Sequence, residues 1–250
     1  MKKQERIWSL RQSTQPNTLD LYIYGFVESD YYDVSSKTSA DYFREELAKY
    51  PNIKKINIYI NSYGGDVFEG TAIHSQLKRH SAEKIVYVDG FACSVASVIA
   101  MAGDKVIMPS NTMMMIHNVW VNAAGNAKEL RKAADDLDVI MEANREAYLE
   151  KSGGKITEEK LIKLLDEETW LTAAKCLEYG FCDEISSKEV DLTEAKQMLQ
   201  KVNSLLKKEK EFRKTTKTKK QKQETMRMMI AAAQAAEKKI IKELREKWHY

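Results

Sequence analysis

Ser94 lies in the segment GFACSVASVIAMAG (residues 90–103), where an expected strand is followed by a short apolar helix. A serine hydroxyl attacks a carbonyl group only if a base removes its proton and donors stabilise the resulting oxyanion. At the start of a helix, backbone amides and the positive helix end favour that negative charge. Ser94 is therefore a candidate nucleophile. The segment alone is also typical of a serine packed in a buried helix.

Four histidines could supply the base. His117 lies in the apolar stretch MMMIHNVW, where burying an imidazole without a partner would be costly. We expect His74, His80 and His249 to be ordinary surface residues because each has polar neighbours or lies near a loop or the tail. His117 is thus the candidate base, and a structural role in its strand remains the alternative.

The turn SYGGD (residues 62–66) contains consecutive glycines whose bare backbone can approach a substrate closely. It could supply oxyanion donors, or it could simply be a tight turn between a strand and a helix. Ser97 is expected to be buried one turn into its helix, and Cys93 to be a small packed residue.

These segments lie between elements that alternate along the chain. Apolar periodicity predicts strands at 19–27, 54–61, 84–89, 105–109 and 113–121, and helices at 39–50, 67–78 and 94–102. The alternation predicts βαβ units and a mostly parallel sheet. In such sheets ligands bind where strands end and helices begin, which is where SYGGD and a tight turn at GFAC are expected.

A long helix is predicted at 127–154, with an apolar stripe through Leu130, Ala134, Leu137, Met141 and Tyr148, interrupted by Asn144 and closed by Gly153. It needs a surface to pack on, which is either another subunit or its own core. A helix at 157–168 and another, capped by Thr172 and ended by Gly180, follow.

The formal net charge of +3 is unevenly distributed. Residues 203–250 contain 15 Lys or Arg against 6 Asp or Glu, so the tail is basic and the rest is mildly acidic. We expect an N-terminal extension (1–18), a main domain (19–202), and a tail (203–250) with a disordered basic part and an amphipathic helix. The three cysteines form no zinc or disulfide pattern, and we see neither a secretory signal nor a membrane span.

Four segments carry a resemblance to a known family. INSYGGDVFEG, DGFACSVASVIAMAGD, MIHN and TWLTAAKCLEYGFCDEI occur in the order and spacing of the ClpP-type serine peptidases. The sequence resembles the phage and prophage head maturation (prohead) proteases more than the housekeeping enzyme. The resemblance covers roughly residues 20–190 and implies an α/β, ClpP/crotonase-like fold in which the 127–154 helix is a protruding handle.

By this resemblance Ser94 is the nucleophile, His117 the general base, and Gly65 and Val95 the donors of the oxyanion-hole amides. The family's third triad member is usually an aspartate, but Glu168 occupies that place here, with Asp166 as the alternative. Tyr63 stands where the family often has proline. The resemblance implies no metal and no organic cofactor.

The implied function is a serine endopeptidase that cleaves scaffold or major capsid proteins in the cytoplasm of a bacterial host, including inside the assembling prohead. Its subunits would form a homo-oligomeric ring through the handle, and no membrane partner is expected. The basic tail could tether scaffold or capsid subunits, be cut by the enzyme itself, bind nucleic acid nonspecifically, or have no specific use. The alternatives are a host-type ClpP subunit working with an ATP-driven unfoldase, an acyl-CoA enzyme of the crotonase fold, and an inactive structural ring component.

Overall fold

The structure is a computed structural model that describes residues 8–29 and 38–186. Its strands are β1 Trp8–Gln12, β2 Thr18–Val27, β3 Lys55–Gly65, β4 Glu83–Cys93, β5 Lys105–Pro109, β6 Met113–Ile116, β7 Thr169–Thr172 and β8 Glu184–Ser186. Its helices are α1 Ala40–Ala48, α2 Val67–Arg79, α3 Val95–Ala100, α4 Ala127–Ser152, α5 Glu158–Asp166 and α6 Ala173–Tyr179. The fold is mixed α/β, as the sequence predicted.

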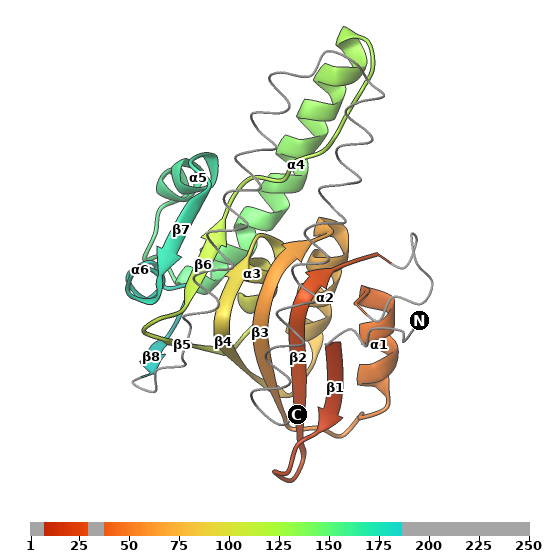
Figure 1. The fold of residues 1–250 in the computed structure, drawn as a ribbon, viewed down its shortest axis with the longest axis vertical. Helices are drawn as coiled ribbons and strands as arrows, with labels where there is room; N and C mark the ends of the chain where they lie inside the picture. Colours follow the sequence, from red (N-terminus) through yellow and green to blue (C-terminus); the bar gives the residue numbers. More distant parts are fainter. Residues whose placement is uncertain (1–7, 30–37, 187–250) are drawn as a thin grey trace, which may run out of the picture. The chain divides into compact units, whose positions relative to one another are not determined.

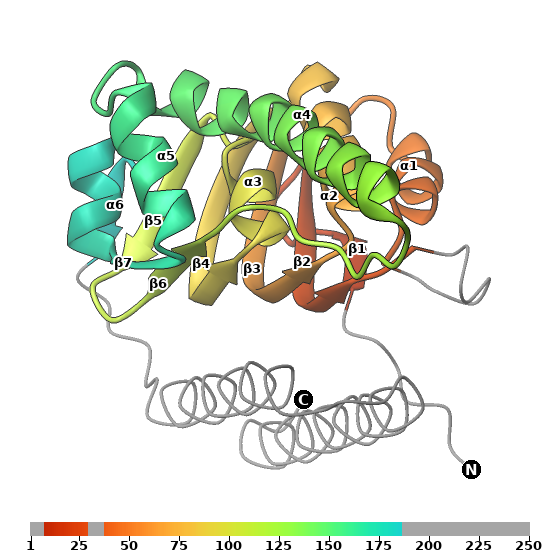
Figure 2. The ribbon, with the colours of Figure 1, turned by 90° about the horizontal axis from the view of Figure 1, so that it is seen from above.

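A central sheet runs in the order β1-β2-β3-β4-β5-β8, and β6 joins it between β4 and β7. The pairs β2–β3, β3–β4, β4–β5, β4–β6 and β5–β8 are parallel, and β1–β2 and β6–β7 are antiparallel. The prediction of a mostly parallel sheet is therefore confirmed. Helices α1 to α4 lie on one face of it (Figures 1 and 2).

The apolar core lies between the sheet and this helical layer. Ile56, Ile58 and Ile60 of β3 alternate along the strand and are fully buried, as are Ile73 and Leu77 of α2. Burying each such side chain contributes about 1.5–3 kcal/mol. Tyr59 is stacked between Tyr22 and Tyr87, with ring centroids 4.7 Å and 5.2 Å apart. The alternation predicted from the sequence thus separates a core face from a tyrosine-lined face.

Helix ends agree with the predicted caps. The side chains of Ser39 and Thr172 accept hydrogen bonds from the backbone amides of Tyr42 and Lys175. Gly153 and Gly180 end α4 and α6 in the left-handed conformation, at φ 57° and 77°. These residues satisfy helix-terminal groups that lack intrahelical partners.

Several predicted boundaries are wrong. The N-terminal extension contains β1, which pairs antiparallel with β2. Neither SYGG nor GFAC is a tight turn, because β3 continues to Gly65 and β4 to Cys93. Glycine is a turn signal in sequence, but here pairing with neighbouring strands keeps both segments in the sheet, with a register shift in SYGG between Ser62 and Gly64.

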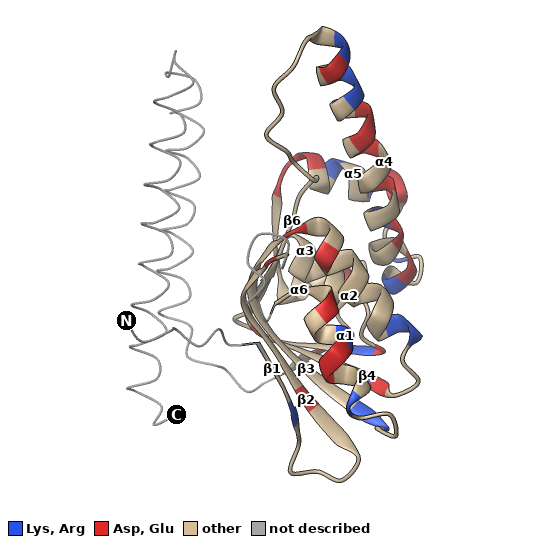
Figure 3. Cartoon of the chain, turned by 90° about the vertical axis from the view of Figure 1, so that its right-hand side faces the viewer, with Lys and Arg blue, Asp and Glu red and all other residues tan. Residues whose placement is uncertain are grey.

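Helix α4 has two different halves. Met141, Asn144, Ala147 and Tyr148 are buried near its C-terminal end, whereas the stripe residues Leu130 and Ala134 are exposed. In Figure 1 the N-terminal half extends beyond the sheet, and in Figure 3 acidic and basic residues are distributed along the helix. The predicted stripe therefore packs on the core of the same chain only in its second half.

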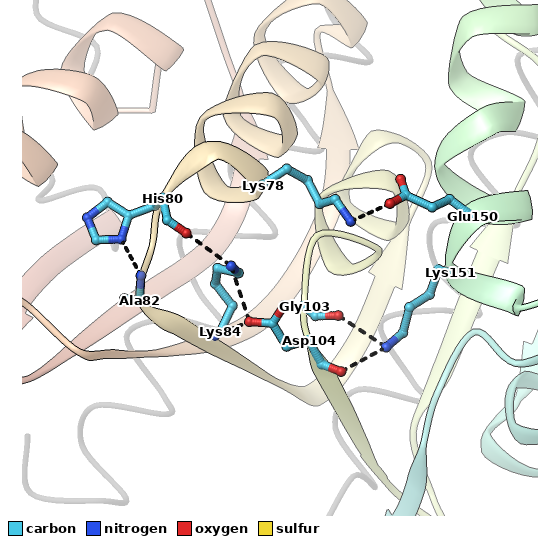
Figure 4. A network of polar contacts seen from close by, with 8 residues as sticks. All are labelled: Lys78, His80, Ala82, Lys84, Gly103, Asp104, Glu150 and Lys151. Carbon is cyan, nitrogen blue, oxygen red and sulfur yellow. Dashed lines mark hydrogen bonds and ion pairs between the residues drawn. The ribbon is translucent and has the colours of Figure 1, made fainter.

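Polar contacts fix the C-terminal half of α4 to the body (Figure 4). The Lys78 ammonium of α2 is 2.7 Å from Glu150. The Lys151 ammonium donates to the Gly103 carbonyl at 3.1 Å. It also donates to the Asp183 carboxylate at 2.6 Å. Buried Asn144 accepts a hydrogen bond from Thr71 of α2 at 3.2 Å. The base of the projecting helix is therefore held by α2 and by the loops around β5.

Several predictions fall outside the described residues. They are the boundary between residues 202 and 203, the disordered basic segment, the C-terminal amphipathic helix and His249. In residues 8–29 and 38–186, no helix has the length and apolar character needed to cross a bilayer.

Candidate active site

The segments singled out in the sequence meet where three parallel strands end. Strands β3, β4 and β6 run parallel and end at Gly65, Cys93 and Ile116. Strand β4 pairs with β5 through its first half and with β6 through Phe91–Cys93. Because of this division, β6 lies beside the end of β4 that leads into Ser94.

Ser94 links β4 to α3 in a conformation that is rare for a residue with a side chain. Its φ is 55° and its ψ −133°, a combination outside the main regions allowed to L-residues. Such strain costs about 1–3 kcal/mol and is concentrated at functional sites. Ser94 is the N-cap of α3, yet its hydroxyl makes no capping hydrogen bond. The half-buried side chain is thus not used to stabilise the helix end, unlike most N-cap serines.

The neighbouring strand holds Ser94 directly, because the Ser94 amide donates to the Met115 carbonyl of β6 at 2.8 Å. His117 was predicted inside this strand, but β6 ends at Ile116 and His117 follows it. Met114 and Ile116 are fully buried, whereas Met113 and Met115 are half-buried. His117 is half-buried as well, which matches the alternation of Met113 and Met115.

Strand β7 brings Glu168 to the same end of the sheet. Ile116 pairs with Thr169 in the last pair of the antiparallel ladder. His117 follows Ile116 and Glu168 precedes Thr169, so both residues directly adjoin this last pair. Glu168 is exposed and has a positive φ of 49°. Its backbone is therefore strained where α5 gives way to β7.

Asp166, the alternative acid, lies at the last residue of α5 and binds a different side chain. Its carboxylate accepts a hydrogen bond from the Asn118 amide group at 2.6 Å. This contact joins the residue after His117 to the end of α5. Asn118 was not singled out from the sequence. The sequence signal that could have identified Asn118 is a polar residue shortly after a buried strand.

The two glycines of SYGG are required for different contacts. A Cβ on Gly64 would lie 2.6 Å from the Cys93 carbonyl oxygen and 2.7 Å from the Ser94 Cβ. A Cβ on Gly65 would lie 2.0 Å from the Val27 carbonyl oxygen, and φ there is 147°. Gly64 is therefore the glycine that packs directly against Ser94. The oxyanion-hole role expected for the Gly65 amide is a separate prediction.

Val95 is the first residue of α3 and is buried. Its side chain packs on α2, because a Cβ on Gly70 would lie 2.1 Å from Val95 Cγ2. Ser97 is fully buried, as predicted. Cys93 is also buried, and burial raises the pKa of its thiol, so this cysteine is not a thiolate nucleophile at neutral pH.

The remaining histidines of the described residues lie elsewhere. His80 is half-buried after α2, and its Nδ1 accepts the Ala82 amide at 3.1 Å. His74 was expected on the surface, but it is half-buried in α2, and burial lowers its pKa. Within the described ranges, no three His, Cys, Asp or Glu side chains cluster as metal ligands would.

Comparison with known proteins assigns the family. Residues 34–189, more than half of the chain, match the Clp protease family. The chain belongs to the Clp protease family. It is 34% identical over 140 residues to the ATP-dependent Clp protease proteolytic subunit of Porphyromonas gingivalis, covering 54% of this chain and 61% of that protein. The matched segment includes less than two thirds of that relative's length.

Two further relatives are also Clp protease subunits. A Bacteroides fragilis protein with the same name is 31% identical over 139 residues, which are 54% of this chain and 66% of that protein. The ATP-dependent Clp protease proteolytic subunit 3 of Rhodococcus jostii is 28% identical over 136 residues, with the same two coverages. The resemblance to the Clp family is confirmed at this level, and the prohead branch stays a prediction.

Proposed function

We propose that this chain is a serine endopeptidase whose nucleophile is Ser94. The observation that carries the proposal is the strained turn between β4 and α3, where an N-cap serine leaves its hydroxyl out of the helix cap. A sharp strand-to-helix turn of this kind exposes a nucleophilic hydroxyl in other hydrolases. The match to the Clp protease family supports the same reaction.

In the proposed reaction, His117 accepts the proton of the Ser94 hydroxyl as Oγ bonds to the peptide carbonyl carbon. The tetrahedral intermediate collapses, the C–N bond breaks, and His117 gives the proton to the leaving amine. A water molecule then attacks the acyl carbonyl carbon while His117 takes its proton. The ester bond to Ser94 Oγ breaks, the acid product leaves, and His117 returns the proton to Ser94 Oγ. The bond between the Ser94 amide and the Met115 carbonyl supports this pairing, because it fixes the nucleophile beside the strand that leads into His117.

Glu168 is the proposed third member, orienting the His117 ring and stabilising the imidazolium that forms. Its position supports this choice over Asp166, because Glu168 directly precedes Thr169, the partner of Ile116 in the β6–β7 ladder. Asp166 already accepts a short hydrogen bond from Asn118, which makes it the weaker candidate.

The proposed oxyanion donors are the backbone amides of Gly65 and Val95. Val95 follows the nucleophile and starts α3, where the first amides have no intrahelical partner. Removing one such donor typically lowers kcat by about 10²- to 10³-fold. The reaction as proposed requires no metal or organic cofactor.

We further propose that the subunits assemble into a ring through α4 and act on extended or unfolded protein segments. Exposed apolar side chains support self-association: Leu130 and Val139 of α4 are 44% and 66% exposed, and Trp120 in the segment before α4 is 60% exposed. A partner subunit would cover them.

Head maturation in a phage, acting on scaffold or major capsid protein in the host cytoplasm, is our proposal for the biological role. Tyr63 in the place of the usual proline and the long basic C-terminal region support it. The relatives' printed names instead favour a subunit that works with an ATP-driven unfoldase. These two roles share the chemistry and differ in the partner.

The test compares hydrolysis of a fluorogenic peptide by wild type, Ser94→Ala and Ser110→Ala, the last changing an exposed serine. We expect Ser94→Ala to abolish turnover and Ser110→Ala to preserve it. Equal activity in all three proteins, or none in the assembled wild type, would reject the peptidase and favour a structural ring component. Cleavage of scaffold protein without ATP would support head maturation, whereas dependence on an unfoldase and ATP would support the other role.

A further inference from the structure

Two buried hydroxyls connect α4 to the backbone of the Ser94 turn. Ser97 Oγ lies 2.5 Å from the Ser94 carbonyl oxygen and 2.7 Å from the Tyr148 hydroxyl oxygen. Ser97 is fully buried in α3, and Tyr148 of α4 is only 2% exposed. The edge of the Tyr148 ring is enclosed as well, with Phe181 at 5.4 Å between centroids. Both hydroxyl groups are therefore shielded from bulk water.

The direction of both hydrogen bonds follows from counting protons. A carbonyl oxygen only accepts, so Ser97 must donate its single hydroxyl proton to the Ser94 carbonyl. The Tyr148 hydroxyl must then donate to Ser97 Oγ. The same Ser94 carbonyl also accepts the Ser97 amide at 2.9 Å. The result is an ordered relay from Tyr148 through Ser97 to the Ser94 carbonyl, in which each group is satisfied.

This relay fixes the orientation of the next amide. The Ser94 carbonyl and the Val95 N–H belong to one peptide group, and the described residues contain no cis peptide bond. In a trans peptide the N–H points opposite to the C=O. Holding the carbonyl toward Ser97 therefore holds the Val95 N–H away from it. The strained ψ of −133° at Ser94 is the torsion that sets this orientation.

We propose that Ser97 and Tyr148 are positioning residues that keep the Val95 N–H aimed as an oxyanion donor. This inference rests on the proposed peptidase function. Neither side chain touches the substrate, and both act through the Ser94–Val95 peptide. Without the relay, rotation of that peptide would relieve the strain at Ser94 and turn the donor away.

The test uses Ser97→Ala, Tyr148→Phe and the double variant in the assembled protein. We expect Ser97→Ala to lower kcat about 20-fold and Tyr148→Phe about fivefold, with KM within twofold, because misorienting a donor costs less than removing it. Since the two groups act in series, the double variant should be no slower than Ser97→Ala. Affinity for a peptide boronate, which forms a tetrahedral adduct, should fall in parallel with kcat.

Ser152→Ala is the matched control. Ser152 is also a buried helical serine that donates to the carbonyl three residues earlier, with Oγ 2.7 Å from the Leu149 oxygen. We expect this variant to lose stability but to keep kcat and boronate affinity. If Ser97→Ala does not fold, the isosteric Tyr148→Phe decides alone.

Unchanged kcat and boronate affinity in Tyr148→Phe and Ser97→Ala, or losses no larger than in Ser152→Ala, would overturn the inference while the peptidase proposal stands. Activity that does not depend on Ser94 would overturn both.

Discussion

Gly64→Ala probes the contact between the end of β3 and the candidate nucleophile. The new Cβ would lie 2.6 Å from the Cys93 carbonyl oxygen and 2.7 Å from the Ser94 Cβ, where ordinary contact begins at 3.4 Å. Both neighbours are parts of the Ser94 turn and its strand, so neither can move away as a flexible side chain would. We expect the Ser94 turn to shift by about 0.7–0.8 Å, since the two contacts fall short of an ordinary one by 0.8 Å and 0.7 Å.

The expected effect has two parts. Placing alanine at φ +84° costs about 1–2 kcal/mol of stability, and the overlap adds about 1–3 kcal/mol. A misplacement approaching 1 Å in a reacting group costs about 10²-fold in rate. We therefore expect kcat to fall about 50-fold.

Gly154→Ala separates the two parts, because Gly154 has the same φ of +84° but nothing within 4 Å of its Cβ position. It should lose only the conformational part of the stability, about 1–2 kcal/mol, and keep its kcat. Peptide hydrolysis at saturating substrate and denaturant unfolding measure both quantities. A kcat for Gly64→Ala equal to that of Gly154→Ala would refute the proposed packing of Gly64 against the nucleophile.

Three further changes test other parts of the structure. Glu168→Gln should lower kcat by at least about 10²-fold, and Asp166→Asn by less than about tenfold, in peptide hydrolysis; the reverse order would assign the triad acid to Asp166. Burial raises the pKa of Asp89 to about 6, while its hydrogen bond from Tyr24 lowers it. The folded state then binds more protons than the unfolded state between about pH 4 and 6, so the free energy of unfolding should fall as pH rises through that window. Asp89→Asn should remove this part of the pH dependence in denaturant unfolding at pH 4.5 and 7.5, and an unchanged difference would contradict the burial argument. Gly70→Ala should cost about 1–3 kcal/mol through overlap with Val95, and adding Val95→Ala should recover part of that stability; no recovery would show that the overlap is relieved elsewhere.

Most of the fold could be predicted from the sequence because its signals are local. The alternating isoleucines of β3 and the caps of α1 and α6 each depend on a few neighbouring residues. The boundaries that the sequence predicted wrongly all depend on pairing with another strand. Strand β1 forms only because β2 is beside it, and GFAC stays extended because it pairs with Met113–Met115.

The candidate site shows the same division. Ser94 and His117 stood out by their residue types and by a family resemblance, and the strands that carry them are neighbours. The contacts of Gly64 and Tyr148 could not be seen in the sequence. Tyr148 was expected only as part of an apolar stripe, and its hydroxyl contacts Ser97, 51 residues away in the chain, because α3 and α4 meet in space.

The most direct test of the central claim is labelling of the assembled protein with a serine-reactive fluorophosphonate, followed by peptide mass spectrometry. The account predicts one adduct, on Ser94, and a labelling rate reduced at least about 10²-fold in His117→Ala. An adduct on another serine, or Ser94 labelling that is unaffected by His117→Ala, would contradict the pairing of nucleophile and base on which the proposed chemistry depends.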